Sequence, residues 1–364
     1  MINDNIEISL LKDSDIDEVI SFFNIVANGA RNSKKFAWEF QNAPAGKAIY
    51  VIAKDITTQK IIGTQCAIPI ELITDDGKVI LTGKSEDSIL HPDYRGMKIF
   101  DKMYQYLFIK CKEQGIKYLW GFTSAKKPFF KLGFEIQYDH SQSLKVIDTF
   151  SSYKYLSKLN SKNNFISLTK IFSLSVLSKL YSIKNSFIST KEIDRDFTYD
   201  IMKSLSKDSS NIVNPSFKGF IIKQDIPFLE WRIENNLYHD KIFNINFYKN
   251  KVPVANLLFN HHIDGVWYLI NDIYTSEVSE EQKCKIHNKA IKILLQQEQN
   301  TIKLIRTWDF THNEYGKNEL ENRKRIGYYH LDRGISFVWK SLDDNNELDV
   351  TNFNLSRIAT QGII

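Results

Sequence analysis

The chain carries the same landmarks twice in the same order, and this repeat constrains its fold more than any other feature of the sequence. Trp38–Asn42 recurs as Trp231–Asn235, and Lys131–Phe134 recurs as Arg325–Tyr328. Self-similarity over such a span indicates two copies of one structural unit. Chance matching of short apolar words is the alternative, but it does not explain why the landmarks keep their order.

The segments between these landmarks also favour duplication. In each half, an aromatic residue that opens a strand-like run stands twelve positions after the tryptophan, at Tyr50 and at Phe243. Further on, each half has apolar residues at helical spacing followed by a compact apolar strand. These predicted helix and strand pairs lie at 99–114 and 116–122, and at 281–297 and 302–308.

Length and composition fit two globular domains. The 364 residues are 43% hydrophobic and 25% charged, which is typical of folded domains of about 150 residues each. The alternation of predicted strands and helices indicates the α/β class. The expected organisation is an N-terminal domain, a helical connector, a C-terminal domain and a C-terminal tail, at 1–148, 149–192, 193–345 and 346–364.

The cysteines and the N-terminal residues exclude several classes of protein. Cys66, Cys111 and Cys284 are far apart and form no CxxC pair. This spacing argues against a structural zinc site and a disulfide scaffold, and it favours a reducing compartment. Residues 1–7 lack the basic start and apolar run of a signal peptide, and no run approaches the length of about 18 apolar residues that a membrane span needs. We therefore expect a cytoplasmic protein without a metal centre.

The net charge of +5 comes from one segment. Between Thr149 and Lys191 there are seven lysines and no acidic residue, so the remainder of the chain is slightly negative. Apolar residues recur there at helical intervals among serines and lysines, which predicts an amphipathic helix. One interpretation is a basic helix lying on an anionic membrane or nucleic acid. The other is a connector that packs its apolar stripe between the two halves.

We favour the connector, because single, spaced lysines make a weak electrostatic patch. No nucleic-acid-binding module accompanies the segment. The expectation is therefore a protein that binds no nucleic acid and forms no stable association with membranes.

The sharpest local pattern is the segment Ser88–Phe100, in which a strand-like run passes through a turn into a helix. A helix N-terminus presents unpaired backbone N–H groups and the positive end of the helix dipole, so such a turn can hold a phosphate group. Gly96 allows close approach of the backbone, and Arg95 and Lys98 add positive charge. The segment is therefore a candidate anion-binding site.

This turn and the elements after it, taken in order, resemble the GNAT superfamily of acyl-CoA-dependent N-acetyltransferases. The matching parts are the turn His91–Gly96, the helix from Ile99, the strand Ile116–Phe122 and the aromatic segment Phe129–Phe134, which ends in KLGF. The resemblance covers about residues 5–145. Together with the repeat, it implies two GNAT-like domains in tandem, each a mixed β-sheet flanked by helices.

The resemblance implies acetyl-CoA as co-substrate and assigns residues to it. Backbone groups of the strand edge before the turn would bind the pantetheine arm, and the loop after the turn would bind the pyrophosphate. A hydroxyl after the next strand would hydrogen-bond CoA, unless it only caps a helix. In this sequence the strand edge is Ser88, Ile89 and Leu90, the loop is Arg95, Gly96, Met97, Lys98, Ile99 and Phe100, and the hydroxyl is that of Ser124.

The sequence departs from the family pattern at two places. Lys98 and Phe100 stand where the family has small residues, so the backbone approaches the anion less closely or Lys98 helps to hold it. Phe129 stands where many members have the tyrosine that protonates the departing thiolate. The proton must then come from Tyr94, from Tyr138 or from water.

Attack of an amine on a thioester is helped by a carboxylate that accepts the amine's proton. Glu86 and Asp87 lie just before the strand edge and are the catalytic candidates, with a solvated or lysine-paired carboxylate as the alternative for each. Because neighbouring residues of a strand point to opposite faces, we expect only one of them to face the substrate. The resemblance to larger, duplicated GNAT proteins favours Asp87.

The second copy lacks the features of the anion site. The segment Tyr274–Glu281 has neither glycine nor a basic residue and carries three glutamates, which would repel a pyrophosphate. We expect this half to form one wall of a substrate cleft between the two halves, with Trp231 and Tyr238 as substrate-binding candidates. His261 and His262 are not expected to bind a metal together, because neighbours on a strand face opposite ways.

The predicted function is transfer of the acetyl group of acetyl-CoA to an amine of a small polar acceptor, for which an amino sugar is the analogy. A Fem-type aminoacyl transferase and a non-catalytic GNAT-fold binding module are the alternatives. Lys98, Phe100 and Phe129 favour the module, whereas the CoA-like loop argues against the Fem-type reaction. The sequence leaves open the acceptor, the length of the acyl group and the oligomeric state.

Overall fold

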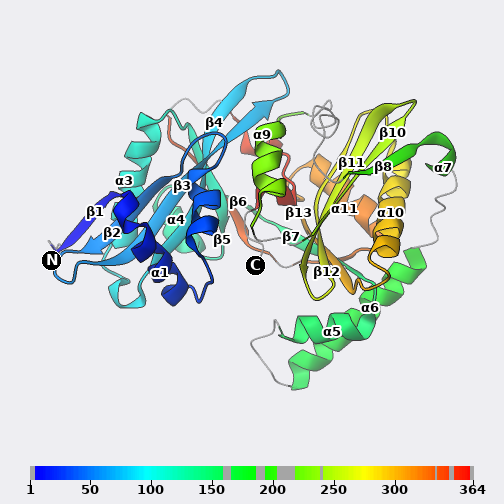
Figure 1. The fold of residues 1–364 in the computed structure, drawn as a ribbon, viewed down its shortest axis with the longest axis horizontal. Coiled ribbons are helices and arrows are strands. Elements are labelled where there is room, and N and C mark those ends of the chain that lie inside the picture. Colours follow the sequence, from blue (N-terminus) through cyan, green and yellow to red (C-terminus); the bar gives the residue numbers. More distant parts are fainter. Residues whose placement is uncertain are drawn as a thin grey trace.

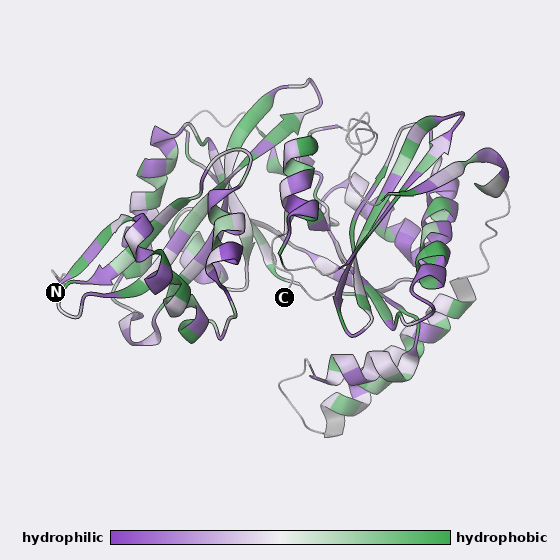
Figure 2. Cartoon of the chain, viewed as in Figure 1, coloured by the Kyte–Doolittle hydropathy of each residue, from purple (hydrophilic) through white to green (hydrophobic). Residues whose placement is uncertain are grey.

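The computed structural model describes residues 5–158, 165–185, 193–202, 218–237, 241–332, 334–343 and 348–360. These residues form two sheets that lie side by side along the long axis of the molecule, with helices packed against them (Figure 1). Hydrophobic residues concentrate along the strands of both sheets (Figure 2). The architecture is therefore α/β in each half.

The first sheet has eight strands, and two of them come from the C-terminal half of the chain. Its order is β1 (Ile6–Leu10), β2 (Ile49–Asp55), β3 (Lys60–Thr74), β4 (Val79–Leu90), β5 (Tyr118–Thr123), β15 (Ser336–Ser341) and β6 (Glu135–Asp139), with β9 (Phe220–Ile222) paired to β3. All neighbours are antiparallel except β4 and β5, which are parallel. A parallel pair needs a crossover, and α3 (Ile99–Glu113) supplies it.

The second sheet has seven strands and repeats this plan. Its order is β8 (Thr198–Met202), β10 (Ile242–Lys249), β11 (Val252–Ile263), β12 (Val266–Tyr274), β13 (Leu304–Asp309), β7 (Ser141–Val146) and β14 (Tyr329–Leu331). Here too a single pair, β12 and β13, is parallel. The crossover is α10 (Glu280–Gln297).

Shorter helices complete each copy. Those of the first half are α1 (Ile16–Val26), α2 (Ser33–Phe36), the π-helical turn η2 (Ala37–Gln41) and α4 (Lys126–Lys131), with 3-10 turns η1 (Asp13–Asp15) and η3 (Pro92–Tyr94). The connector contains α5 (Thr149–Lys158) and α6 (Phe165–Asn185). Those of the second half are α7 (Ile193–Asp196), α9 (Ile226–Leu229), the π-helical turn η4 (Glu230–Glu234) and α11 (Glu314–Arg325), with 3-10 turns η5 (Val350–Asn352) and η6 (Arg357–Ala359).

The two halves of the chain exchange one interior strand each, in addition to β9 at β3. β15 lies between β5 and β6 in the first sheet, and β7 lies between β13 and β14 in the second. Once this exchange is recognised, the two sheets have the same strand order. The predicted tandem of two mixed sheets flanked by helices is confirmed.

The predicted domain limits at 1–148 and 193–345 stay a prediction. The strands of each sheet do not all come from within one of these two ranges. β7 falls within the first of these ranges but lies in the second sheet, and β15 falls within the second range but lies in the first sheet. Periodicity identifies a strand by its own residues and does not identify the strand it pairs with. This is why the sequence did not predict the exchange.

The predicted helix at 99–114 forms as α3 and ends at Glu113. Met103, Leu107 and Cys111 share one side of it and are fully buried against the first sheet. Gly115 follows with a φ of +76°, a conformation that glycine adopts without steric cost and that ends a helix.

The repeated tryptophans meet where the two copies touch. The rings of Trp38 and Trp231 stack with their centroids 5.8 Å apart and their planes at 29°. The indole Nε1 of each residue donates a hydrogen bond of 2.7 Å to the backbone oxygen of the other. Equivalent residues of two copies meet reciprocally when the copies are related by an approximate two-fold axis. The sequence repeat is therefore also the centre of the interface.

The connector does not lie between the two halves, contrary to the sequence-based expectation. α5 and α6 form a hairpin beside β7 and β14 of the second sheet (Figure 1). On α6 the apolar Leu177 and Leu180 are exposed, whereas Ser175 and Ser178 are buried. The expectation was wrong because periodicity locates an apolar stripe but does not say that the stripe faces inward.

We expect the tryptophan pair to stabilise both copies together. Trp38→Ala and Trp231→Ala should each lower the free energy of unfolding by about 3–5 kcal/mol, because each removes a buried ring and leaves the partner's carbonyl without its donor. The double variant should lose less than the sum, since the two residues touch. Urea unfolding followed by circular dichroism measures these values.

Trp267, which is buried in the second sheet, supplies the matched control. Trp38→Ala combined with Trp267→Ala should be additive, because the two residues belong to separate hydrophobic clusters. Additive losses for the Trp38 and Trp231 pair would contradict the proposed coupling.

Candidate functional site

The first copy opens a slot where β4 and β5 part. The two strands pair only at Thr82–Lys84 with Tyr118–Trp120 in the part of the chain that the structure describes. Beyond this point β4 continues to Leu90 while staying paired to β3. Ile89 and Leu90 pack on the two opposite faces of the sheet, so only their backbone is offered along the free edge. This edge is the predicted pantetheine-binding strand.

A β-bulge interrupts β4 at the predicted catalytic pair. The register with β3 shifts between Thr64 and Cys66, and Asp87 has a φ of +54°, in the left-handed region that Asp tolerates better than most residues. Because the bulge adds a residue, Glu86 and Asp87 carry their side chains on the same face, away from α3. The strict alternation behind the expectation that only one of them faces the substrate does not hold here, since it applies only to a regular strand; which of the two faces the substrate stays a prediction.

The Asp87 carboxylate is held by two side chains that the sequence did not single out. Arg31 donates from Nη1 and Nη2 at 2.5 and 3.0 Å, and the Tyr50 hydroxyl donates at 2.6 Å. Burial, reinforced by the charge of Asp87, raises the pKa of Tyr50 well above its usual value, so Tyr50 stays protonated as a donor. With 6% of its side chain exposed, Asp87 is a buried, fully bonded anchor.

Glu86 is the more accessible carboxylate of the pair. Its side chain is 30% exposed and forms an ion pair with the buried Lys84. Burial, followed by the charge of Arg232, lowers the pKa of Lys84 to about 7. Glu86 is therefore partly exposed to solvent and lies beside a lysine that loses its proton more readily than usual.

Two further residues of this cluster come from the repeated landmark itself. Glu39 follows Trp38 and accepts from Arg31 at 3.3 Å, and Arg232 follows Trp231 in the second copy. Arg232 Nε donates to the backbone oxygen of Ile358 at 3.1 Å. In the sequence, the only indication that Glu39 and Arg232 belong to one cluster is that they carry opposite charges at equivalent positions of the repeat. The cluster thus joins the slot of the first copy to the second copy and to the C-terminal tail.

The turn after β4 leads to an exposed helix N-terminus. Arg95, Met97 and Lys98 are exposed, and the side chain of Lys98, which stands at the N-cap position of α3, makes no capping hydrogen bond. Gly96 has a φ of +85° with open space around it, and Lys98 has a φ of +59°. The first residues of the predicted pyrophosphate loop therefore lie together at the start of α3 and are exposed to solvent.

The bulky residues of this loop do not close it. Phe100 turns inward, with its ring 4.8 Å from that of Tyr104 and 5.9 Å from that of Phe129. Ile99 is buried under the loop. Lys98 points to solvent and adds charge, so the departures from the family pattern leave the backbone of the loop exposed.

Ser124 lies exposed directly after β5, on the far side of the slot from the loop. Its hydroxyl does not cap α4, because the cap position is Ala125, whose N–H is bonded to the Thr123 hydroxyl. The exposed Lys126 and Lys127 begin α4 and add positive charge that the sequence analysis missed.

Of the two hydroxyls considered for the thiolate proton, that of Tyr94 is hydrogen-bonded and that of Tyr138 is buried without a hydrogen-bond partner among the described residues. Tyr94 donates to Asp55 at 2.6 Å, and this bond raises the pKa of Tyr94. Tyr138 is buried, which raises its pKa, and its ring stacks 3.7 Å from that of His312. Phe129 is itself buried.

A buried ring of hydrogen bonds backs the β4 edge instead. The Tyr104 hydroxyl lies 2.8 Å from that of Ser85 and 3.0 Å from that of Ser88. Gln65 closes the ring, donating to Ser85 at 3.0 Å and accepting from Ser88. Ser88 is exposed, so its hydroxyl is where this ring reaches the slot.

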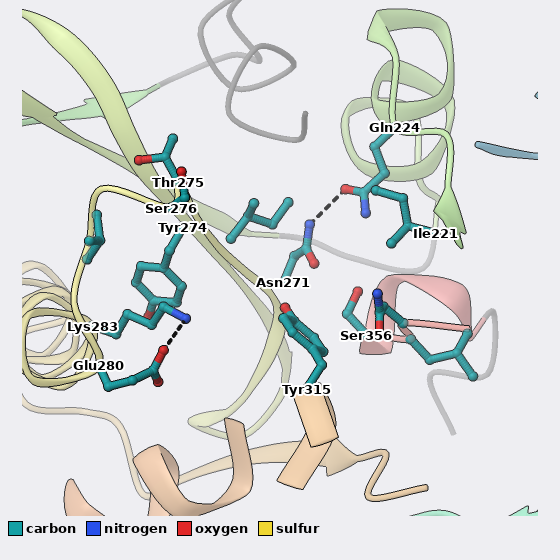
Figure 3. A pocket seen from close by; sticks show the side chains of 14 residues that line it. Ile221, Gln224, Asn271, Tyr274, Thr275, Ser276, Glu280, Lys283, Tyr315 and Ser356 are labelled. Carbon is teal, nitrogen blue, oxygen red and sulfur yellow. Dashed lines mark hydrogen bonds and ion pairs between the residues drawn. The ribbon is translucent and has the colours of Figure 1, made fainter. Parts of the chain in front are cut away.

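The corresponding place in the second copy has different chemistry (Figure 3). β12 and β13 pair only over Val266–Tyr268, and a cavity of about 240 Å³ opens beside the end of β12. Asn271 donates across it to Gln224 at 2.8 Å. The remaining walls come from the start of α10, from α11 and from the tail residues 354–356.

The N-terminus of α10 is closed by its own side chains. Ser279 and Gln282 form a capping box, which satisfies the first N–H groups. Glu280 pairs with Lys283 at 2.8 Å, and Glu281 adds a second carboxylate. These features favour the expectation that this half does not bind CoA, which stays a prediction.

The structure describes one of the two substrate-binding candidates, Trp231. Trp231 is buried against Trp38 and does not line the cavity. Tyr238 lies outside the described residues. His261 accepts from the N–H of Gly265, and His262 packs against Tyr268. Among the described residues, no three His, Cys, Asp or Glu side chains are grouped as a metal site would require.

Comparison with known proteins defines the class. Residues 7–137 match the model of the acetyltransferase (GNAT) domain. Residues 7–137 are therefore similar to a GNAT acetyltransferase domain, and the chain as a whole shares the fold of a tandem GNAT protein. No curated protein sequence matches the chain.

Solved structures share the fold of nearly the whole chain. A probable N-acyltransferase from Enterococcus faecalis has a TM-score of 0.63 at 6% identity, over 93% of this chain and 73% of that one. A tandem GNAT protein from the clavulanic acid biosynthesis pathway has a TM-score of 0.58 at 8% identity, over 94% and 100%. A fungal glucosamine N-acetyltransferase region has a TM-score of 0.55 at 12% identity, over 92% and 38%.

The buried Glu39 predicts how stability depends on pH. Burial raises its pKa from 4.5 to about 7, so the folded protein holds a proton there that the unfolded chain loses above pH 4.5. Stability contributed by this proton is complete below pH 4.5 and is lost as pH rises through 7. Glu39→Gln should therefore match the wild-type protein at low pH and exceed its free energy of unfolding by a few kcal/mol above pH 7.

Urea unfolding at a series of pH values measures this difference, and the exposed Glu277→Gln is the matched control. The control should track the wild-type protein throughout. A Glu39→Gln curve parallel to wild type at all pH values would contradict the raised pKa.

Proposed function

We propose that the chain transfers an acetyl group from acetyl-CoA to an amine of a small polar acceptor by direct attack on the thioester. The observation that carries the proposal is the free edge of β4 beside the uncapped N-terminus of α3. The edge offers backbone groups to the amide-bearing pantetheine arm, and the helix N-terminus offers N–H groups to a pyrophosphate. An amino sugar is one such acceptor, and the similarity to a glucosamine N-acetyltransferase region supports it.

The CoA molecule would be bound by two elements, the edge of β4 and the loop that leads into α3. Backbone groups of Ser88, Ile89 and Leu90 would hold the pantetheine arm, as an added strand pairs with a sheet edge. The loop of Arg95, Gly96, Met97, Lys98, Ile99 and Phe100 would hold the pyrophosphate, with Ser124 across the slot. Arg95 and Lys98 would contribute charge-assisted hydrogen bonds.

Glu86 would take the proton of the attacking amine, and Asp87 would hold the bulge that positions it. As the amine nitrogen bonds to the carbonyl carbon, its proton passes to Glu86 directly or through water, and the carbon–sulfur bond breaks. The thiolate leaves into an exposed slot, where solvent supplies its proton. The acceptor would approach from the face that carries Glu86, opposite α3.

The non-catalytic binding module remains the second candidate, because the buried Phe129 removes the family's usual proton donor. In that case acetyl-CoA or a related ligand would bind without turnover. Binding and turnover measured on the same variants separate the two.

We expect charge reversal in the loop to weaken acetyl-CoA binding. Arg95→Glu and Lys98→Glu should each raise the dissociation constant by tenfold or more, because each replaces an attraction to the pyrophosphate by a repulsion. Thermal-shift titration with acetyl-CoA measures the change. Glu281→Lys, at the N-terminus of α10, should leave the affinity unchanged. Tighter binding by Glu281→Lys would show that the second slot takes CoA, and the absence of binding by the wild-type protein would contradict the proposal.

The two carboxylates should respond differently to amidation. Glu86→Gln should lower kcat about a hundredfold with acetyl-CoA affinity unchanged, because the amide cannot accept the proton of the amine. Asp87→Asn should lower the free energy of unfolding by about 3 kcal/mol or more, because Arg31 is left buried without its main partner. Steady-state kinetics with an amino-sugar acceptor and urea unfolding measure these effects. Full activity of Glu86→Gln would contradict its role.

A further inference from the structure

Helix α6 packs with its small polar side facing inward. Ser175, Ser178 and Ser182 are spaced by three and four residues, share one face and are buried. The Ser182 hydroxyl donates to the backbone oxygen of Gly327 at 2.6 Å, and a Cβ on Gly327 would lie 2.8 Å from the Cα of Ser182. The helix therefore approaches the second copy closely through small residues rather than through an apolar stripe.

The outer side of α6 is apolar. Phe172, Leu177, Leu180 and Ile183 are 47–58% exposed, and Leu180 is the most exposed of them. On the neighbouring α5, Phe150 is 70% exposed. The ring of Phe172 meets that of Tyr153 on α5 edge-on at 5.5 Å, yet about half or more of each of these side chains stays exposed, although a helix on a soluble surface normally turns such residues inward. An exposed apolar face of this kind marks an interaction surface.

The charged residues on these two helices are all lysines, and the exposed Asp148 lies just before α5. Lys154, Lys158 and Lys170 are exposed on the two helices, and the sequence has no acidic residue between Thr149 and Lys191. A second copy of the chain would bring the same lysines against these, which repel one another. An anionic surface complements them instead.

We propose that the hairpin of α5 and α6 docks on the surface of an anionic lipid bilayer. The apolar side chains of α6 would enter the boundary between headgroups and acyl chains, and the lysines would meet the lipid phosphates. No helix of the described residues is long and apolar enough to cross a membrane, so the contact is peripheral. Figure 1 places α5 and α6 far from α3, at the other end of the molecule, so the slot of the first copy would stay accessible.

Sedimentation of the full chain with vesicles tests this. The protein should pellet with vesicles of equal parts phosphatidylcholine and phosphatidylglycerol, and should largely remain in solution with phosphatidylcholine alone. Raising the salt concentration should release it, because the attraction is screened. Leu177→Ser with Leu180→Ser should weaken partitioning at least tenfold, and Lys154→Ala with Lys158→Ala and Lys170→Ala about a hundredfold.

Matched controls come from the turn between β10 and β11, where Val252 and Lys251 are exposed. Val252→Ser and Lys251→Ala should bind vesicles as the wild-type protein does. Circular dichroism checks that all variants fold. Failure of the folded wild-type protein to pellet with anionic vesicles overturns the proposal, as does pelleting that the helix variants do not reduce.

Analytical ultracentrifugation without lipid distinguishes membrane binding from dimerisation through the exposed face of α6. A monomer, or an oligomer that the α6 variants leave unchanged, supports the membrane contact. A dimer that Leu177→Ser with Leu180→Ser dissociates would overturn it in favour of a second copy on this face. Neither result depends on acetyl-CoA binding, so the test stands apart from the proposed reaction.

Discussion

The exchange of β15 and β7 between the two sheets is the constraint on which the rest of the structure depends. Each exchanged strand is hydrogen-bonded on both sides within the other half's sheet, so neither sheet is complete without residues from the other half of the chain. The Trp38 and Trp231 pair then fixes how the copies face each other. Because Arg232 follows Trp231 directly, the same interface brings a residue of the second copy to the charged cluster behind the β4 bulge.

The two copies share one fold, but the helix N-termini beside their diverging parallel strands differ in charge and capping. In the first copy the helix after the parallel strand begins at an uncapped turn between Arg95 and Lys98, which suits an anion. In the second copy Ser279 and Gln282 cap the equivalent helix and carboxylates surround it. The backbone geometry that opens the slot is common to both, and a few side chains at one helix turn decide its electrostatic character. This difference is why the proposal gives the binding of CoA to the first copy alone.

Part of this picture could be predicted from sequence because it is local. The helix at 99–113, the turn before it and the repeat of the Trp38 segment all follow from spacing and residue type. The bulge at Asp87 could not be predicted, because one inserted residue changes no periodic pattern strongly. Arg31 and Tyr50 reach Asp87 from distant segments, and strand partners are likewise set by tertiary packing. For α6 the stripe was recognised, but its direction depended on the fit of the buried serine side of the helix, where Ser182 lies closely against Gly327.

The central claim is that one of two related slots binds acyl-CoA. Isothermal titration of the full chain with acetyl-CoA measures the number of sites directly. The account predicts one molecule bound per chain. Two bound molecules would mean that the carboxylates and cap of α10 do not exclude CoA, and no binding would remove the basis for acyl transfer by this chain.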